Sequence, residues 1–229
     1  MLVSHRYKFI YTKTVKTAGT SVESFFEPYC MKEDEWSLSH SRNEYISEAG
    51  IIGYRGKDIP DNCTWYNHMP AVKIKTLLGD DIWNSYFKFC VIRNPFSKAV
   101  SHYYFQGKKK LLTGKKGFFN KFLLLTEKNK FQEYLKKIKP PLDRDKYVIN
   151  GEFCMNDVIR QESLNQDIER ICNKLLIPYE PEKIPFFKKN ENQKKMTLQQ
   201  LYSDKAKAII EKRYAFELKY FNYSFPNDK

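Results

Sequence analysis

The chain of 229 residues has little of what marks several common classes of protein. Its five cysteines are scattered and none forms a C-x-x-C pair, so the sequence indicates no zinc site and favours a reduced setting. No run of about 20 apolar residues occurs, so we expect no membrane span. The N-terminus has no apolar segment of signal-peptide length either, and together these absences predict a cytoplasmic protein.

Positive charge and aromatic side chains, in contrast, are abundant. Lys and Arg number 40 against 27 Asp and Glu, a net charge of +13, and aromatics make up 16% of the residues. This length and core material suit a single domain over residues 1–229. A basic surface suits a polyanionic cofactor or acceptor, nucleic acid or an anionic membrane, although a coding bias toward Lys accounts for part of the excess. No RNP-like aromatic strand or zinc knuckle occurs, so we expect no nucleic-acid partner.

One short segment has the features of a phosphate-binding loop. Residues 16–21 read Lys-Thr-Ala-Gly-Thr-Ser and lie between a strand-like run, 7–12, and a helix-like run, 22–26. The first turn of a helix has unpaired N–H groups and a partial positive charge, and a phosphate there satisfies both. The glycine allows close approach of the backbone. The hydroxyls add donors and the lysine adds a full charge, so the segment predicts a phosphate cradle.

A second segment has a related construction. The nearly continuous apolar run 87–92 predicts a strand buried on both faces of a parallel sheet. It leads directly into Arg93, then Pro95, a residue that favours the first turn of a helix. Ser101 follows nearly two turns into that helix. Arg93 thus lies at the carboxyl end of the strand, where ligands bind in such sheets, and Ser101 lies on the helix that follows.

The order of residues in the first loop distinguishes it from an NTP-binding loop. That loop reads G-x-x-x-x-G-K-[ST], with its Lys after the Gly. Here Lys16 precedes Gly19 and position 12 is Thr, so the pattern is not met. The order K-T-x-G-T-S instead resembles the 5′-phosphosulfate loop of the sulfotransferases that use 3′-phosphoadenosine 5′-phosphosulfate (PAPS). The segment from Arg93 to Ser101 resembles the 3′-phosphate motif of the same family.

This resemblance implies a cofactor, its binding residues and a reaction. The implied cofactor is PAPS, leaving the product PAP, with no metal. The residues that would bind it are Lys16, Thr17, Ala18, Gly19, Thr20, Ser21, Arg93 and Ser101. Looser similarities over 158–167 and 209–225 point to the branch that includes glycan-modifying sulfotransferases. Three positions depart from the family pattern, namely Val15 for Pro, Lys98 for Arg and Glu217 for Asp.

The pattern of elements predicts an α/β fold with a P-loop-like parallel sheet flanked by helices on both faces. Residues 30–64 are polar and read as an irregular excursion. The expected strands are 7–12, 64–68, 87–92 and 156–160, and the expected helices are 20–27, 71–78, 95–106, 118–139, 164–176 and 203–220.

Sulfuryl transfer to a hydroxyl needs a cation beside the leaving phosphate and a base for the acceptor. Lys16 is the candidate cation. His68 is the candidate base, because an imidazole titrates near neutrality and relatives often place their base between the two phosphate motifs. Glu23, Glu27 and His102 are its rivals.

The expected acceptor bears a hydroxyl group, and an anionic glycan is among the candidates. The basic stretch 107–117 either receives that acceptor or is a solvated loop, and Lys188, Lys189 and Asn190 belong to a loop that could cover the cofactor. A P-loop kinase that needs Mg²⁺ and a non-catalytic nucleic-acid binder are the alternative functions.

Overall fold

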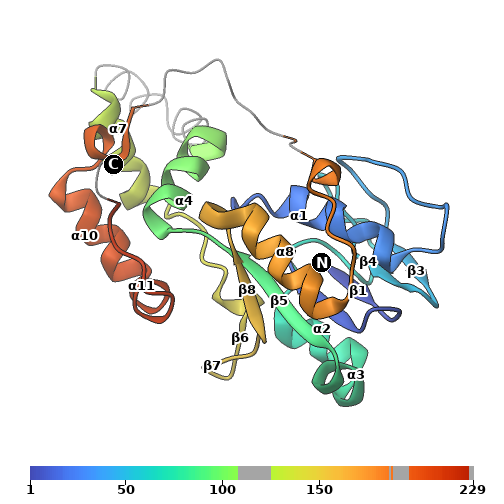
Figure 1. The fold of residues 1–229 in the computed structure, drawn as a ribbon. Helices are drawn as coiled ribbons and strands as arrows, with labels where there is room; N and C mark the ends of the chain where they lie inside the picture. The colour runs from blue at the N-terminus through green and yellow to red at the C-terminus, as the bar shows by residue number, and fades with distance from the viewer. Residues whose placement is uncertain (108–124, 186, 188–195, 227–229) are drawn as a thin grey trace. The chain divides into compact units, whose positions relative to one another are not determined.

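The computed structural model describes residues 1–107, 125–185, 187 and 196–226. The chain forms two compact units, coloured along the chain in Figure 1. Unit 1 comprises Met1–Ile92 and Asp143–Lys189, and unit 2 comprises Arg93–Leu142 and Asn190–Lys229. That the whole chain is one domain stays a prediction.

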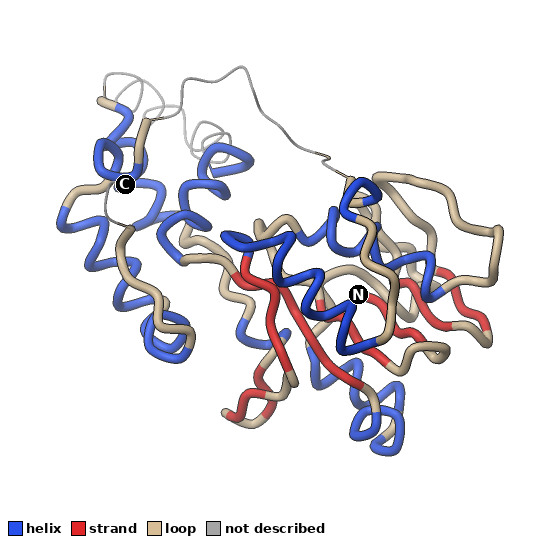
Figure 2. The backbone as a smooth tube through the Cα atoms, viewed as in Figure 1, coloured by secondary structure: helices blue, strands red, loops and turns tan. Residues whose placement is uncertain are grey.

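A six-stranded sheet organises unit 1, with the strand order β3-β4-β1-β2-β5-β8 (Figure 2). β2 (Phe9–Thr12), β5 (Phe87–Ile92) and β8 (Asp157–Arg160) are parallel neighbours. Thr12 pairs with Cys90 at the end of their shared ladder, so the carboxyl ends of β2 and β5 lie at the same edge of the sheet.

The other half of the sheet is antiparallel, so the prediction of a parallel sheet is correct only for its core strands. β1 (Leu2–Ser4) pairs antiparallel with both β2 and β4 (Gly50–Ile52), and β3 (Tyr45–Ser47) pairs with β4. The connections between β1 and β2 and between β3 and β4 are too short for the crossover that parallel pairing requires. The excursion at 30–64 therefore contributes two strands, and no strand forms at 64–68.

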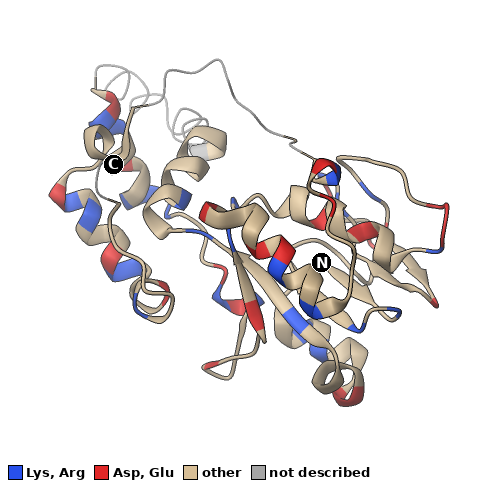
Figure 3. Ribbon diagram, in the orientation of Figure 1, with Lys and Arg blue, Asp and Glu red and all other residues tan. Residues whose placement is uncertain are grey.

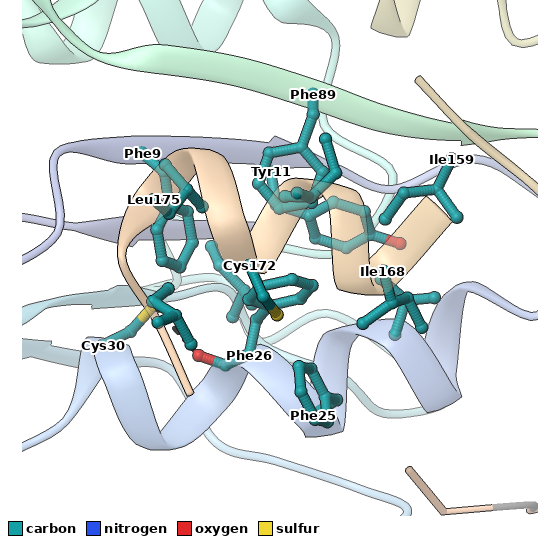
Figure 4. Packing of buried hydrophobic residues seen from close by; sticks show 14 of the residues in the cluster. Phe9, Tyr11, Phe25, Phe26, Cys30, Phe89, Ile159, Ile168, Cys172 and Leu175 are labelled. Carbon is teal, nitrogen blue, oxygen red and sulfur yellow. Dashed lines mark hydrogen bonds between the residues drawn. The ribbon is translucent and has the colours of Figure 1, made fainter. Parts of the chain in front are cut away.

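Helices cover both faces of the sheet, as predicted. α1 (Gly19–Phe26) and α8 (Leu164–Leu175) pack on one face, where their apolar side chains meet over β2 (Figure 4). On the other face lie α2 (Ala71–Leu78) and α3 (Asp80–Ser85). The remaining described elements of unit 1 are 3-10 turns and a hairpin, at Glu27–Cys30, Arg144–Lys146, Gln161–Ser163, Pro181–Lys183, β6 (Val148–Ile149) and β7 (Glu152–Phe153).

Unit 2 is helical and has an aromatic core. Its described helices are α4 (Pro95–His102), which continues into the π turn Tyr103–Gly107, α7 (Glu127–Lys137), α9 (Leu198–Leu201), α10 (Asp204–Arg213) and α11 (Ala215–Tyr220). The helix predicted over 203–220 is divided because Tyr214 leaves the helical conformation. The helix predicted over 118–139 is described only from Glu127, and its first residues lie outside the described part of the chain.

Charged residues of both signs are interspersed on the described elements of each unit (Figure 3). The excess of Lys and Arg is thus not confined to one helix or strand of the described chain.

The helix α8 supplies a test of this packing. Ile168 is fully buried in the core of unit 1, so Ile168→Ala should lower the free energy of unfolding by about 2–5 kcal/mol in urea titrations. Gln166→Ala, on the exposed side of the same helix, should change it by less than about 0.5 kcal/mol. Equal, small effects of the two substitutions would contradict the assigned core.

Candidate phosphosulfate site

The predicted phosphate loop lies where β2 ends and α1 begins. Thr12 is the last residue of β2 and Gly19 the first of α1. Within the loop, Lys16 has a φ of 63° and Ala18 a φ of 64°, both in the left-handed region. This conformation costs a non-glycine residue roughly 1–2 kcal/mol. Left-handed residues within a tight turn bring successive N–H groups onto one concave surface, which is a binding geometry for anions.

The start of α1 is open to such an anion. Ala18, at the N-cap, makes no side-chain capping hydrogen bond, and the first turn contains no acidic residue. No carboxylate of that turn therefore competes for its N–H groups. Lys16 and Thr20 are partly exposed, whereas Thr17 is buried. The residues predicted to hold the phosphosulfate thus occupy one continuous turn and helix start.

Gly19 is needed for close packing rather than for an unusual backbone angle. A Cβ at this position would lie 3.1 Å from Lys13 Cγ, 3.2 Å from Tyr11 Oη and 3.3 Å from the Thr14 carbonyl oxygen. The Tyr11 hydroxyl also donates a hydrogen bond of 3.2 Å to the Gly19 carbonyl. A larger residue would therefore require these neighbours to shift by a few tenths of an ångström.

Residues far away in the sequence tether the first part of the loop. The Thr14 hydroxyl donates to the Val91 carbonyl of β5 and lies 2.7 Å from the Thr17 hydroxyl. The Val15 N–H donates to Asp143 Oδ2 over 3.0 Å. The loop is therefore held to the end of the neighbouring strand and to a segment that follows much later in the chain.

A buried network of ion pairs joins the loop to α1. The Glu23 carboxylate is fully buried and accepts from Lys13 Nζ and from Arg55 Nη1, each at 2.6 Å, and from the α-amino group of Met1 at 2.7 Å. Burial alone would raise the pKa of Glu23, but the three cations hold this pKa well below its usual range. Glu23 is therefore ionised and fully engaged.

Glu27, one turn later on the chain, belongs to the same network. Its carboxylate accepts from Arg55 and, at 2.9 Å, from Arg42 Nη2, and the Trp36 indole N–H lies 3.3 Å from it. The two rival carboxylates thus serve as structural partners of buried cations, which makes neither suited to take a proton from an acceptor.

His68, the candidate base, lies against the predicted phosphate loop. Its Nδ1 is 3.1 Å from the Lys13 carbonyl oxygen. Because a carbonyl only accepts, Nδ1 carries the proton, and in the neutral ring Nε2 is the unprotonated nitrogen. Burial, then the charges of Lys13 and the α-amino group, lower the pKa of His68 to about 4, against a smaller opposing effect of Asp143. His68 is thus neutral at physiological pH, and its pKa lies below the value near 6–7 expected from the sequence.

The other histidines near these motifs have structural partners. His102 is buried in unit 2 with Nδ1 2.6 Å from the Tyr134 hydroxyl, and the two rings stack. His5 Nδ1 lies 2.9 Å from the Tyr86 hydroxyl. His102 is therefore a weaker candidate base than the sequence alone suggested.

The second motif has the strand end and the helix start that its sequence predicts, and it begins unit 2. β5 ends at Ile92, Arg93 follows, and α4 starts at Pro95. Asn94 caps this helix, because its Oδ1 accepts from the Phe96 N–H at 3.0 Å. Ser101 lies in the last turn of α4 and is partly exposed.

Lys98, which departs from the family's arginine, is buried in unit 2. Its ammonium lies 5.7 Å from the centre of the Tyr214 ring, within the range of a cation–π contact. This lysine thus has a packing role that the sequence motif did not reveal.

The comparison with known families agrees with both motifs. A sequence model of the sulfotransferase family matches residues 1–224. This chain belongs to the sulfotransferase family. Because that family consists of PAPS-dependent transferases, the protein is an enzyme of the transferase class. No curated protein and no solved structure matches it significantly.

Three further observations concern the membrane, metal and loop expectations for this sulfotransferase. None of its described helices is long and apolar enough to cross a membrane. Among the described residues no group of His, Cys, Asp and Glu could hold a metal ion. The basic residues 108–117 and the trio Lys188, Lys189 and Asn190 lie outside the described part of the chain.

Sequence reasoning missed the residues that support the loop from outside it. Asp143 and Arg55 belong to no recognised motif, and Lys13 stands just before one. The structural role of a charged residue in an otherwise buried segment can be recognised only once its partners are known.

The Glu23 network predicts a pH-dependent contribution to stability. Glu23→Gln should lower the free energy of unfolding by roughly 3–5 kcal/mol at pH 7, because it leaves Lys13 and Arg55 buried beside a neutral group. Folding lowers the pKa of Glu23, so the stabilisation by its ion pairs is complete above the pKa of Glu in the unfolded chain, about 4.3. This stabilisation is lost as the pH falls toward the pKa of Glu23 in the folded protein. Urea titrations in steps from pH 7 downward should therefore show a narrowing difference between the wild type and the variant. Glu48→Gln, at an exposed position of unit 1, is the control. If the difference in unfolding free energy between the wild type and Glu23→Gln stayed constant as the pH falls, the assigned ion pairs would be refuted.

Proposed function

We propose that this sulfotransferase binds PAPS at the turn from Lys16 to Ser21 and moves a sulfuryl group to an acceptor hydroxyl. The observation that carries the proposal is the turn itself, with left-handed Lys16 and Ala18 at an uncapped helix start. It occurs in a chain of which residues 1–224 match the family. That match favours sulfuryl transfer over a P-loop kinase or a nucleic-acid binder.

The residues present suit the two charged ends of PAPS. Lys16, Thr17, Ala18, Gly19, Thr20 and Ser21 would hold the 5′-phosphosulfate by N–H groups, hydroxyls and one ammonium. Arg93 and Ser101 would hold the 3′-phosphate. When bound, PAPS supplies an activated sulfuryl group on a phosphate leaving group.

Two side chains have distinct parts in the proposed transfer. Lys16 offsets the negative charge that develops on the departing phosphate oxygen. His68 takes the proton of the acceptor hydroxyl at Nε2, the nitrogen left unprotonated by the bond from Nδ1 to the Lys13 carbonyl. The anchored Nδ1–H fixes the orientation of the ring during that transfer.

The acceptor that we propose is a glycan hydroxyl. The proposal rests on the similarity of residues 158–167 and 209–225 to the glycan-modifying branch, and the net charge of +13 would suit an anionic acceptor.

Arg93 provides the test of cofactor recognition. In EDTA, calorimetry should show that wild-type protein binds PAP, because side chains and N–H groups alone hold the phosphates. Arg93→Ala should weaken PAP binding by roughly 10- to 150-fold, the value of a charge-assisted contact, and should hardly affect adenosine 5′-phosphosulfate, which has no 3′-phosphate. Lys205→Ala, exposed on α10, removes the same charge and should change neither affinity. Equal losses for the two ligands in Arg93→Ala would exclude a role in reading the 3′-phosphate.

Lys16 and His68 should be separable by binding and pH. Lys16→Ala should lower turnover by about 10²–10³ and weaken PAP binding, because it removes a charge beside the phosphate. His68→Ala should lower turnover by roughly 10²–10⁴ with nearly unchanged PAP affinity. In the wild type, kcat/KM should fall as the pH drops through the His68 pKa of about 4, since protonated Nε2 cannot act as a base.

The histidine control for this experiment is His5→Ala, which should keep both the rate and the acid limb. A His68→Ala enzyme that retains wild-type turnover and the same limb would show that another group is the base.

A further inference from the structure

Asp143 lies far from either motif in the sequence but contacts the phosphate loop. It is 1% exposed and begins the second stretch of unit 1, just before the turn Arg144–Lys146. The Lys146 N–H donates to the Asp143 carbonyl over 2.8 Å, so this turn fixes the backbone at Asp143. The carboxylate is therefore presented from a defined position.

The Asp143 carboxylate contacts the residue that precedes the left-handed turn. Asp143 Oδ2 accepts the Val15 N–H at 3.0 Å. Val15 lies after the end of β2 and before α1, so neither the sheet nor the helix provides a partner for its N–H. The Asp143 carboxylate is the partner of this N–H, at an ordinary N–H···O distance.

Three successive residues of the loop are each held by a different part of unit 1. The Lys13 carbonyl accepts from His68, the Thr14 hydroxyl donates to Val91, and the Val15 N–H donates to Asp143. The next residue, Lys16, adopts the left-handed conformation. Contacts from the surrounding structure are what sustain such a conformation in a non-glycine residue.

We propose that Asp143 is a positioning residue that fixes the phosphosulfate loop through the Val15 N–H. The role rests on the proposed function, because it presumes that the turn from Lys16 to Ser21 binds the 5′-phosphosulfate. The positioning role of Asp143 also requires an N–H group at position 15, and a proline there would have none to donate.

The charge of Asp143 makes this role distinguishable from a purely electrostatic one. A carboxylate near an anion site opposes anion binding by Coulomb repulsion. If charge alone mattered, Asp143→Asn and Asp143→Leu would both tighten PAP binding. A positioning role predicts that the two variants differ. Asp143→Asn retains an oxygen that accepts the Val15 N–H and should retain PAP binding. Asp143→Leu has a side chain of similar size but no acceptor, so it should weaken PAP binding.

The experiment compares these variants in the full chain by calorimetry with PAP. Asp143→Leu should raise the Kd at least about 10-fold, a change of roughly 1.4 kcal/mol, while Asp143→Asn should equal the wild type or bind more tightly. Asp145→Asn, two residues later and with a half-exposed side chain, removes the same charge and should leave the Kd unchanged. If Asp143→Leu does not fold, Asp143→Ala takes its place, since it also lacks an acceptor.

Amide hydrogen exchange provides a second measurement that needs no cofactor. The Val15 amide should exchange faster in Asp143→Leu and remain protected in Asp143→Asn. Unchanged Val15 exchange in Asp143→Leu, or a Kd that stays at the wild-type value, would overturn the positioning role. Failure of wild-type protein to bind PAP would instead overturn the proposed function, so the two failures are distinguishable.

Discussion

The ion pair between Lys13 and Glu23 is the interaction on which the arrangement of the loop depends. Lys13 is the first residue after β2, and Glu23 lies on α1, so their 2.6 Å contact joins the two ends of the phosphate loop. Both groups are buried, and burying a charge is tolerated only where a partner and further hydrogen bonds compensate for lost water. Arg55 completes that compensation and extends the network to Glu27. The geometry of the loop is therefore coupled to the folding of unit 1.

This pairing also assigns different roles to neighbouring lysines. The Lys13 ammonium is committed to Glu23 inside the protein, and burial lowers the pKa of this group in opposition to the carboxylate. Lys16 lies three residues later on the left-handed turn and is partly exposed. One lysine thus builds the loop, while the other is in the position to meet an anion. The sequence motif singled out Lys16 but did not reveal the structural part of Lys13.

His68 connects this architecture with the proposed chemistry. Its bond to the Lys13 carbonyl ties the candidate base to the same residue that anchors the loop. Burial opposes protonation of the imidazole, and the positive charges of Lys13 and the α-amino group add to that effect. Burial and two cations of the network thus keep the candidate base neutral, which is the form that accepts a proton.

The sequence by itself determined the parts of the protein that depend on local order. The apolar run of β5, the bounds of α2, the proline start of α4 and the spacing of apolar residues on α8 follow from neighbours a few positions apart. Both phosphate motifs were readable for the same reason, and they agree with the family match over residues 1–224.

Only the tertiary structure decided what depends on contacts between distant residues. The antiparallel strands β1, β3 and β4 have three residues each, which is too few for an alternation of side chains to be recognised. Glu23 looked like a free carboxylate until Lys13 and Arg55 were placed beside it, and His68 looked like an ordinary imidazole until its burial was known. Asp143 acquires a role only because folding brings it to Val15, across 128 positions of the chain. Burial and pairing with distant residues change the free energy of an ionised side chain. The residues next to it in the sequence do not reveal these two effects.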